Sequence, residues 1–164
     1  MSLNHFIFHI KNPLRLEMSN LKPKEKRQAR ILALQLIYAK DFEGSELDET
    51  CNLIMESDNS LSEEIIIYGK QLSNLVFLKL KELDQLIANK SRNWDFSRIT
   101  LLDKLILRIS LVEMIYVEEV PPKVSIAEGV EIAKLFSTDD SSGFINGILD
   151  SVYNEIIKGK VKSE

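Results

Sequence analysis

The sequence has few of the residues that build disulfides or turn-rich β folds. Cys51 is the only cysteine, so no internal disulfide can form and a reducing compartment is expected. Six glycines and four prolines in 164 residues are too few for a turn-rich all-β fold. No apolar run approaches the ~20 residues needed to span a bilayer. The short apolar stretch 6–10 also lacks the basic segment that precedes the core of a signal peptide. We therefore expect a cytoplasmic protein that does not contact a membrane.

Residues that commonly carry catalysis are also scarce. The only histidines, His5 and His9, have a spacing that could bind a metal on a helix, but no third ligand lies near them. Cys51 has no histidine in the expected folded region to activate it, so it is interpreted as a small buried side chain. The sequence contains no P-loop, no dinucleotide-binding glycine motif, no nucleophile elbow and no CxxC pair. These absences predict a protein that is not an enzyme and has no cofactor or metal.

The charge is unevenly distributed along the chain. The net charge of −4 argues mildly against a nucleic-acid partner. However, residues 11–40 carry eight basic and two acidic side chains, and residues 41–64 carry nine acidic side chains and no basic one. Basic residues near the start of a helix are disfavoured by the helix dipole, so their repetition hints at phosphate binding. Two solvated helix faces would produce the same pattern, and this alternative stays open.

Apolar residues recur at helical spacing through most of the chain, and no segment alternates as a half-buried strand does. The pattern predicts an all-α fold of about six or seven helices. The longest expected helices cover residues 24–42 and 62–89, with Ser62 as the cap of the second. Thr100 is expected to cap a further helix, which the segment 120–122 (VPP) should end.

Two more helix starts lie in residues 124–150, separated by a polar segment. Residues 125–128 (SIAE) have the spacing of a capping box, which predicts a helix start at Ser125. Residues 137–143 (STDDSSG), here called the elbow, favour a turn and the cap of a second helix. Gly147 lies inside that second helix, where we expect it to allow close backbone packing at a cost of ~1 kcal/mol in helix propensity.

Several of these segments resemble the NusB family. The resemblance begins at residues 26–30 (KRQAR) and 33–38 (ALQLIY) and is strongest at residues 122–136 and 144–150 (FINGILD). Between them it is carried by Trp94, Arg98, Asp103, Ile106, Leu107, Arg108 and Glu113. The resemblance implies a NusB-like all-α fold of about seven helices in two small bundles. We expect residues 1–21 to form an N-terminal extension, in part added for expression, and residues 22–164 to form a single NusB-like domain.

The same resemblance implies a transcription antitermination factor without enzymatic activity. NusB proteins bind boxA-type single-stranded nascent RNA together with NusE, a ribosomal small-subunit protein, and modify RNA polymerase for antitermination on ribosomal RNA operons. The positions that match the family's RNA-binding segments are Lys26, Arg27, Arg30, Asp140, Ser141, Phe144 and Asn146. Two further positions, Tyr38 and Asp103, match the side that faces NusE. The resemblance leaves a homodimer open.

Other interpretations remain beside this one. Asp140 or Ser141 could serve only as a helix cap, and Phe144 only as a core residue. Ala127 stands where the family commonly has asparagine and Gly143 where a basic residue occurs, so RNA binding is expected to depend more on a partner. The main alternative function is a helical protein-interaction module without intrinsic RNA binding. The RNA-guiding domain of a ribosomal RNA methyltransferase ranks last.

Overall fold

The computed structural model describes residues 20–91 and 95–157. Within these ranges the chain forms six α-helices and no strand, which confirms the all-α prediction with slightly fewer helices than about seven. They are α2 (Pro23–Glu43), α3 (Leu47–Ser57), α4 (Glu63–Lys90), α5 (Leu101–Tyr116), α6 (Pro122–Phe136) and α7 (Ser141–Val152). A 3-10 turn, Phe96–Arg98, precedes α5, and a π-helical turn, Tyr153–Ile157, follows α7. His5, His9 and Trp94 lie outside the described residues.

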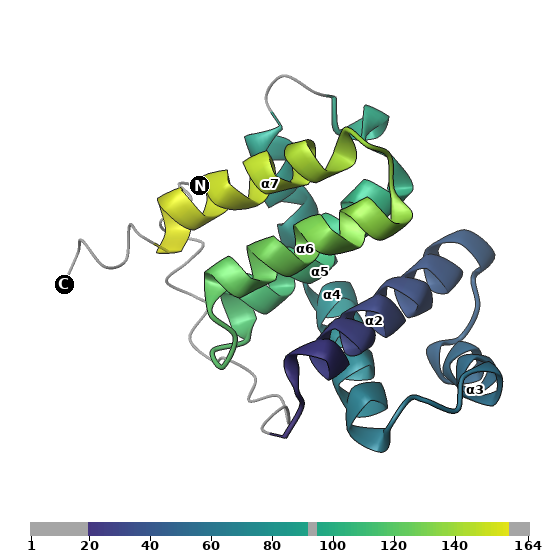
Figure 1. The fold of residues 1–164 in the computed structure, drawn as a ribbon. Coiled ribbons are helices and arrows are strands. Elements are labelled where there is room, and N and C mark those ends of the chain that lie inside the picture. The colour runs from purple at the N-terminus through teal and green to yellow at the C-terminus, as the bar shows by residue number, and fades with distance from the viewer. Residues whose placement is uncertain (1–19, 92–94, 158–164) are drawn as a thin grey trace.

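The helices form two groups that share one core. Figure 1 shows α2 and α3 on one side of the molecule and α6 and α7 on the other, with α4 and α5 between them. The most extensive packing joins α2 to α4 in the first group and α6 to α5 and α7 in the second. Leu21, the last residue of the expected extension, is buried and packs into this core.

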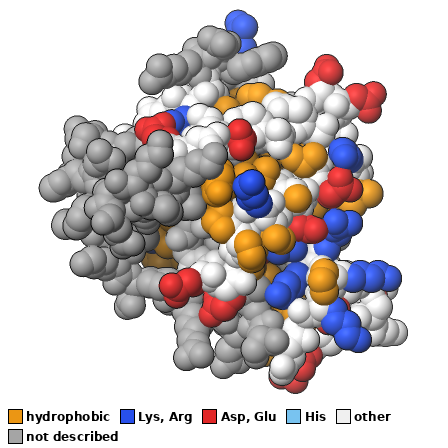
Figure 2. All heavy atoms as spheres, turned by 60° about the vertical axis from the view of Figure 1, so that its left-hand side comes forward, with side chains coloured by type: hydrophobic (Ala, Val, Ile, Leu, Met, Phe, Trp, Pro, Cys, Tyr) orange, Lys and Arg blue, Asp and Glu red, His pale blue; other side chains and the backbone are white. Residues whose placement is uncertain are grey.

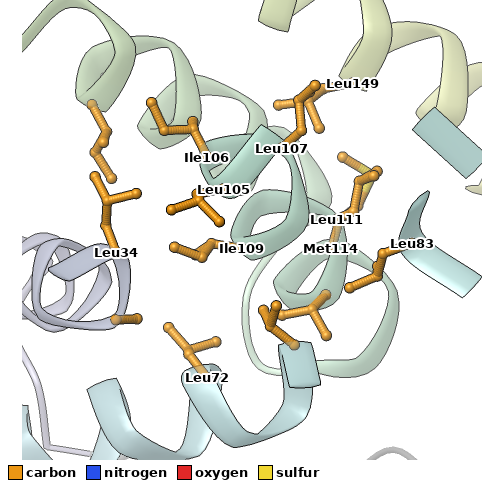
Figure 3. Close-up of a cluster of buried hydrophobic side chains, with 14 of the residues drawn as sticks. Leu34, Leu72, Leu83, Leu105, Ile106, Leu107, Ile109, Leu111, Met114 and Leu149 are labelled. Atoms are coloured by element: carbon orange, nitrogen blue, oxygen red, sulfur yellow. The ribbon is translucent and has the colours of Figure 1, made fainter. Parts of the chain in front are cut away.

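Helix α5 is the centre of the core. Twelve of its sixteen residues are buried, as expected for a helix with apolar residues on all sides. Figure 3 shows its side chains approaching Leu34 and Leu72 on one flank and Leu83 and Leu149 on the other. Each fully buried leucine or isoleucine contributes about 1.5–3 kcal/mol of transfer free energy. None of the described helices has the length and hydropathy that a bilayer-spanning helix requires.

Two predicted helix caps are confirmed. The Ser62 Oγ accepts a hydrogen bond from the Ile65 N–H at 3.4 Å, and the Thr100 Oγ1 accepts one from the Asp103 N–H at 3.2 Å. The predicted burial of Cys51 is also confirmed, since its side chain is 0% exposed beside Leu32 and Leu36. Each cap satisfies a backbone donor that the helix itself leaves unpaired.

The predicted capping box at residues 125–128 is wrong. Helix α6 begins three residues earlier, at Pro122, with Pro121 as the cap residue. Proline at the first helical position has a backbone angle already suited to the helix and lacks only an N–H that would be unpaired there. The two prolines therefore start α6, whereas α5 had already ended at Tyr116.

The expectation for Gly147 is also wrong, because a Cβ at this position would meet nothing within 4 Å. The glycines that permit close packing are Gly69 and Gly129. A Cβ on Gly69 would lie 3.0 Å from the Ala29 carbonyl oxygen, and one on Gly129 would lie 2.4 Å from the Ser110 Oγ. These two glycines bring α4 against α2 and α6 against α5.

Candidate nucleic-acid interface

The first turns of α2 present part of the predicted basic segment to α6. The Arg27 guanidinium, 39% exposed, donates from Nε to Glu128 Oε2 at 2.8 Å and from Nη2 to Glu128 Oε1 at 2.9 Å. These hydrogen bonds raise the pKa of Arg27 above its ordinary value. A bidentate pair of this kind fixes the plane of the guanidinium. Arg27 is therefore half-exposed and held in one orientation.

Arg30 lies one turn further along α2 and is buried, with only 3% of its side chain exposed. Its Nε donates to Glu113 Oε1 at 2.9 Å, and its Nη1 lies 3.4 Å from Glu128 Oε2. Glu113, 1% exposed, also accepts hydrogen bonds from the Tyr68 hydroxyl and, at 2.9 Å, from the Ser125 Oγ. Burial and the negative charge of Glu113 raise the pKa of Tyr68.

The predicted phosphate-binding cations Lys26, Arg27 and Arg30 differ in how far they are exposed. Arg30 belongs to a buried network that joins α2, α4, α5 and α6, so its guanidinium does not lie on the surface. Lys26 is only partly buried, and it forms no ion pair with another residue in the part of the chain that the structure describes. Lys26 and Arg27, near the start of α2, are here called the α2 edge, and the Arg27–Glu128 pair reduces its positive charge. On the face shown in Figure 2, Lys and Arg side chains gather toward one side, with Asp and Glu side chains among them.

The elbow between α6 and α7 is built around Asp103, at the start of α5. The Asp103 carboxylate, 6% exposed, accepts from the Ser137 Oγ at 2.6 Å and from the Ser141 Oγ at 3.0 Å. Ser141 is buried and also shares hydrogen bonds with Ser137 and Thr138. Asp140 is the cap residue of α7, but its side chain makes no capping hydrogen bond. Hydroxyl groups thus tie both sides of the elbow to one buried carboxylate.

A pocket of about 270 Å³ opens at this elbow. The 3-10 turn contributes Arg98, and α7 contributes Phe144, which is partly buried against the core. The remaining lining comes from the start of α5 and the elbow: Ile99, Thr100, Asp103, Thr138, Asp140 and Ser141. Ligand pockets typically occupy about 300–1,000 Å³, so this one fits a single ring better than a chain segment. Asn146 is exposed on α7.

No function was predicted for Arg98 from the sequence, although Arg98 is one of the residues that carry the family resemblance. Its side chain is exposed and lines the pocket together with Asp140. It therefore supplies a positive charge to an elbow where Gly143 supplies none. Glu113 was also missed as the centre of the buried network. Its signal was present in the sequence, because a carboxylate inside an apolar helix requires partners.

The two residues predicted to face a partner lie in different surroundings. Tyr38 is 36% exposed on α2 and stacks on Phe42, which is 68% exposed, with ring centroids 5.4 Å apart. Asp103 is buried under the elbow and lies in the same pocket as Asp140, Ser141 and Phe144. The structure thus joins Asp103 to the predicted RNA-binding residues of the elbow.

The α2 edge and the elbow lie at different points along α6. Arg27 contacts α6 at Glu128, whereas the elbow follows Phe136, the last residue of that helix. Eight residues of α-helix separate these points, which corresponds to about 12 Å along the helix axis. Within the described ranges, no cluster of histidine, cysteine, aspartate and glutamate is arranged to hold a metal ion.

Comparisons with known proteins agree with one another. A model of the NusB family matches residues 27–154. The chain is 40% identical over 131 residues to the transcription antitermination protein NusB of Chloroherpeton thalassium, and the match covers 80% of this chain and 62% of that protein. It is 34% identical over 138 residues to the protein of that name from Geobacter sp. (strain M21), with 80% and 95% covered. The chain therefore spans less than two thirds of the first relative and nearly all of the second.

The fold also matches a solved complex. A chain in the crystal structure of the antitermination factors NusB and NusE in complex with double-stranded RNA aligns with a TM-score of 0.70. The alignment has 21% identity and covers 80% of this chain and 97% of that chain. This likeness shows a shared fold.

Proposed function

Because this chain belongs to the NusB family, we propose that it is a transcription antitermination factor that binds boxA-type nascent RNA together with NusE. In this role it promotes antitermination on ribosomal RNA operons as part of the RNA polymerase antitermination complex. The names of its relatives support the antitermination role, and the fold it shares with a chain of the NusB–NusE–RNA complex supports the choice of partners. We propose no reaction and no cofactor for it.

The observation that carries the RNA proposal is the elbow pocket, where a cation, an aromatic ring and polar groups converge. Single-stranded RNA is bound through phosphate contacts, stacking of splayed bases and hydrogen bonds to base edges. Arg98 supplies a phosphate contact and Phe144 a stacking surface beside it. Ser141 and Asp140 supply polar groups, and the exposed Asn146 reads a base edge as the strand leaves the pocket.

The α2 edge supplies the second part of the proposed surface. Lys26 and Arg27 contact the RNA backbone about two helical turns of α6 away from the elbow. Arg30 acts indirectly in this proposal, because it is buried and holds Glu113 and Glu128 in place behind Arg27. The surface therefore reads bases at the elbow and fixes the position of the backbone at α2.

The proposed NusE surface contains the exposed Tyr38–Phe42 stack on α2. Tyrosine and phenylalanine are enriched in the cores of protein interfaces, and a stacked pair exposed to solvent gains by being covered. Asp103 contributes by holding Ser137 and Ser141, so that a partner that displaces the elbow also alters the pocket.

The elbow is tested by titrating a boxA-type RNA at two salt concentrations, with and without NusE. We expect Arg98→Gln to weaken binding and to make the slope of log affinity against log salt shallower by about 0.7. Phe144→Leu keeps an apolar side chain in the core and should cost up to about 1–3 kcal/mol of binding, with the salt slope unchanged. Lys70→Gln is the matched control, because Lys70 pairs with Asp48 at the α3–α4 contact.

A protein-interaction module without intrinsic RNA binding is the second candidate, favoured by the exposed aromatic stack. Under that function the purified chain would bind NusE and show no RNA affinity at either salt concentration. Unchanged RNA affinity in both Arg98→Gln and Phe144→Leu would instead remove the elbow from the RNA surface.

A further inference from the structure

Arg27 already has an anionic partner in the free protein. Glu128 accepts two hydrogen bonds from its guanidinium, at 2.8 and 2.9 Å, and is only 16% exposed itself. Nε and Nη2 make these bonds, which leaves the N–H groups of Nη1 directed away from the shared carboxylate. A phosphate that approaches Arg27 therefore meets a cation of fixed direction whose charge is largely neutralised.

A residue of the protein interior holds Glu128 in place, so the position of Glu128 does not depend on Arg27 alone. Its Oε2 lies 3.4 Å from the Nη1 of Arg30, which is itself held by the buried Glu113. Charges therefore alternate from the core to the surface in the order Glu113, Arg30, Glu128, Arg27. The first three members are mostly buried, so they fix the position of the fourth.

A fixed and neutralised arginine has two effects on RNA binding. It contributes less to the general attraction of phosphates, which dominates binding to any sequence. A guanidinium of fixed orientation also contacts a phosphate only when the RNA strand is bound in one register. Phosphate contacts of this kind determine which bases lie against the base-reading groups. The first effect lowers affinity for all RNA, and the second favours the RNA whose bases fit the elbow.

We propose that Glu128 is a specificity-determining residue of the RNA surface, which lowers non-specific RNA binding and sets the register in which the elbow reads bases. This inference rests on the proposed RNA-binding function. It assigns Glu128 a positioning role, since its carboxylate acts through Arg27 and does not touch RNA.

The test compares a boxA-type RNA with a scrambled RNA of the same composition, using the full chain. In the Glu128→Gln variant we expect the slope of log affinity against log salt for the scrambled RNA to be steeper than in the wild type by about 0.7. Between about 200 mM and about 50 mM salt, the affinity of the variant should therefore rise about threefold more than that of the wild type. The ratio of the affinity for the boxA-type RNA to that for the scrambled RNA should fall, because Arg27 no longer fixes the register of the bound strand. Glu128→Asp keeps the charge but is too short for the same bidentate pair, so we expect a lower ratio with the salt slope unchanged.

Glu131→Gln is the matched control, because it removes the same charge one turn along the same helix. Glu131 is 44% exposed and pairs with Lys134 at 2.8 Å, without a hydrogen bond to Arg27. We expect this change to raise affinity for both RNAs equally and leave their ratio as in the wild type. Thermal unfolding of each variant confirms that the measured protein is folded.

The outcomes separate the possible failures. A Glu128→Gln protein that is folded and has the wild-type affinity ratio would overturn the specificity role, as would equal weakening of both RNAs. The same fall in the ratio for Glu131→Gln would also overturn it, since net charge alone would then explain the effect. A wild-type chain without affinity for either RNA would instead sink the proposed function, and this inference with it.

Discussion

Arg27 and Arg30 stand three positions apart on α2 and have different environments in the folded chain. Arg27 keeps 39% of its side chain exposed, whereas Arg30 keeps 3% and ends in a network with Glu113 and Tyr68. The sequence assigned both to phosphate binding, because spacing alone does not tell which of two neighbouring cations a later helix will cover. Glu128 and Glu113, far along the chain, decide that difference.

The two arginines should differ sharply in their contribution to stability. We expect Arg30→Met to lower the free energy of unfolding by about 3–5 kcal/mol, because it leaves the buried Glu113 without its cation. Arg27→Met should cost less, about 1 kcal/mol, because Arg27 is 39% exposed and Glu128 keeps Arg30 as a nearby cation. Urea unfolding measures both changes. Equal losses in the two variants would contradict the buried role of Arg30.

The buried Tyr68 makes the free energy of unfolding depend on pH in the alkaline range. Burial, followed by the charge of Glu113, raises its pKa from the ordinary value of 10.0. Above about pH 10 the unfolded chain releases the tyrosine proton while the folded chain retains it, so stability falls as pH rises. We expect Tyr68→Phe to make this decline shallower by up to about 1.4 kcal/mol per pH unit, the limit for one proton.

The measurement is urea unfolding at several values between pH 9 and 11.5. Lysine deprotonation affects the wild type and the variant alike, so the difference between their slopes isolates Tyr68. Parallel declines would show that the hydroxyl is not buried beside Glu113.

At the scale of elements, close helix packing depends on glycines that the sequence did not identify. The added Cβ of Gly69→Ala would lie 2.9 Å from Leu32 Cδ2 and 3.0 Å from the Ala29 carbonyl oxygen, at the contact between α4 and α2. We expect this change to destabilise the protein by about 1–3 kcal/mol through overpacking. Thermal or urea unfolding measures the loss.

Gly147→Ala is the control for this prediction. The same methyl group at Gly147 meets open space in α7, so helix propensity should stabilise the protein by up to about 1 kcal/mol. A stabilising Gly69→Ala would show that α2 and α4 are not held as close as the structure has them.

Local chemistry explains which helices were predicted well. Ser62 and Thr100 cap the helices they were expected to cap, because each accepts a hydrogen bond from a residue three positions away. Ser125 has the same local signal, but Pro122 starts α6 earlier and leaves the Ser125 hydroxyl to donate to Glu113. Glu113 lies on another helix, α5, so the local spacing of residues could not predict its hydrogen bond with Ser125.

For the whole molecule, apolar periodicity was sufficient to predict an all-α fold, and the two helix groups followed from the family resemblance. The elbow residues were identified together because they are close in sequence. Arg98 was left without a role because the fold, and not its neighbours in sequence, brings it to the pocket with Phe144. A site assembled from separate helices is therefore only partly visible in the sequence.

The α2 edge and the elbow are proposed to bind one RNA strand that follows α6. The combined change Lys26→Gln, Arg27→Gln and Arg98→Gln removes three proposed phosphate contacts, two at the edge and one at the pocket. The control combines Lys70→Gln, Lys79→Gln and Lys81→Gln, which remove the same charge from α4.

The most direct measurement is the affinity of these two proteins and the wild type for a boxA-type RNA across a series of salt concentrations. We expect the first triple variant to bind weakly, with a slope of log affinity against log salt shallower by about 1.4, roughly 0.7 each for Lys26 and Arg98, because Glu128 largely neutralises Arg27. The α4 control should keep the wild-type slope. Equal slopes for the two triple variants would contradict a shared RNA surface along α6.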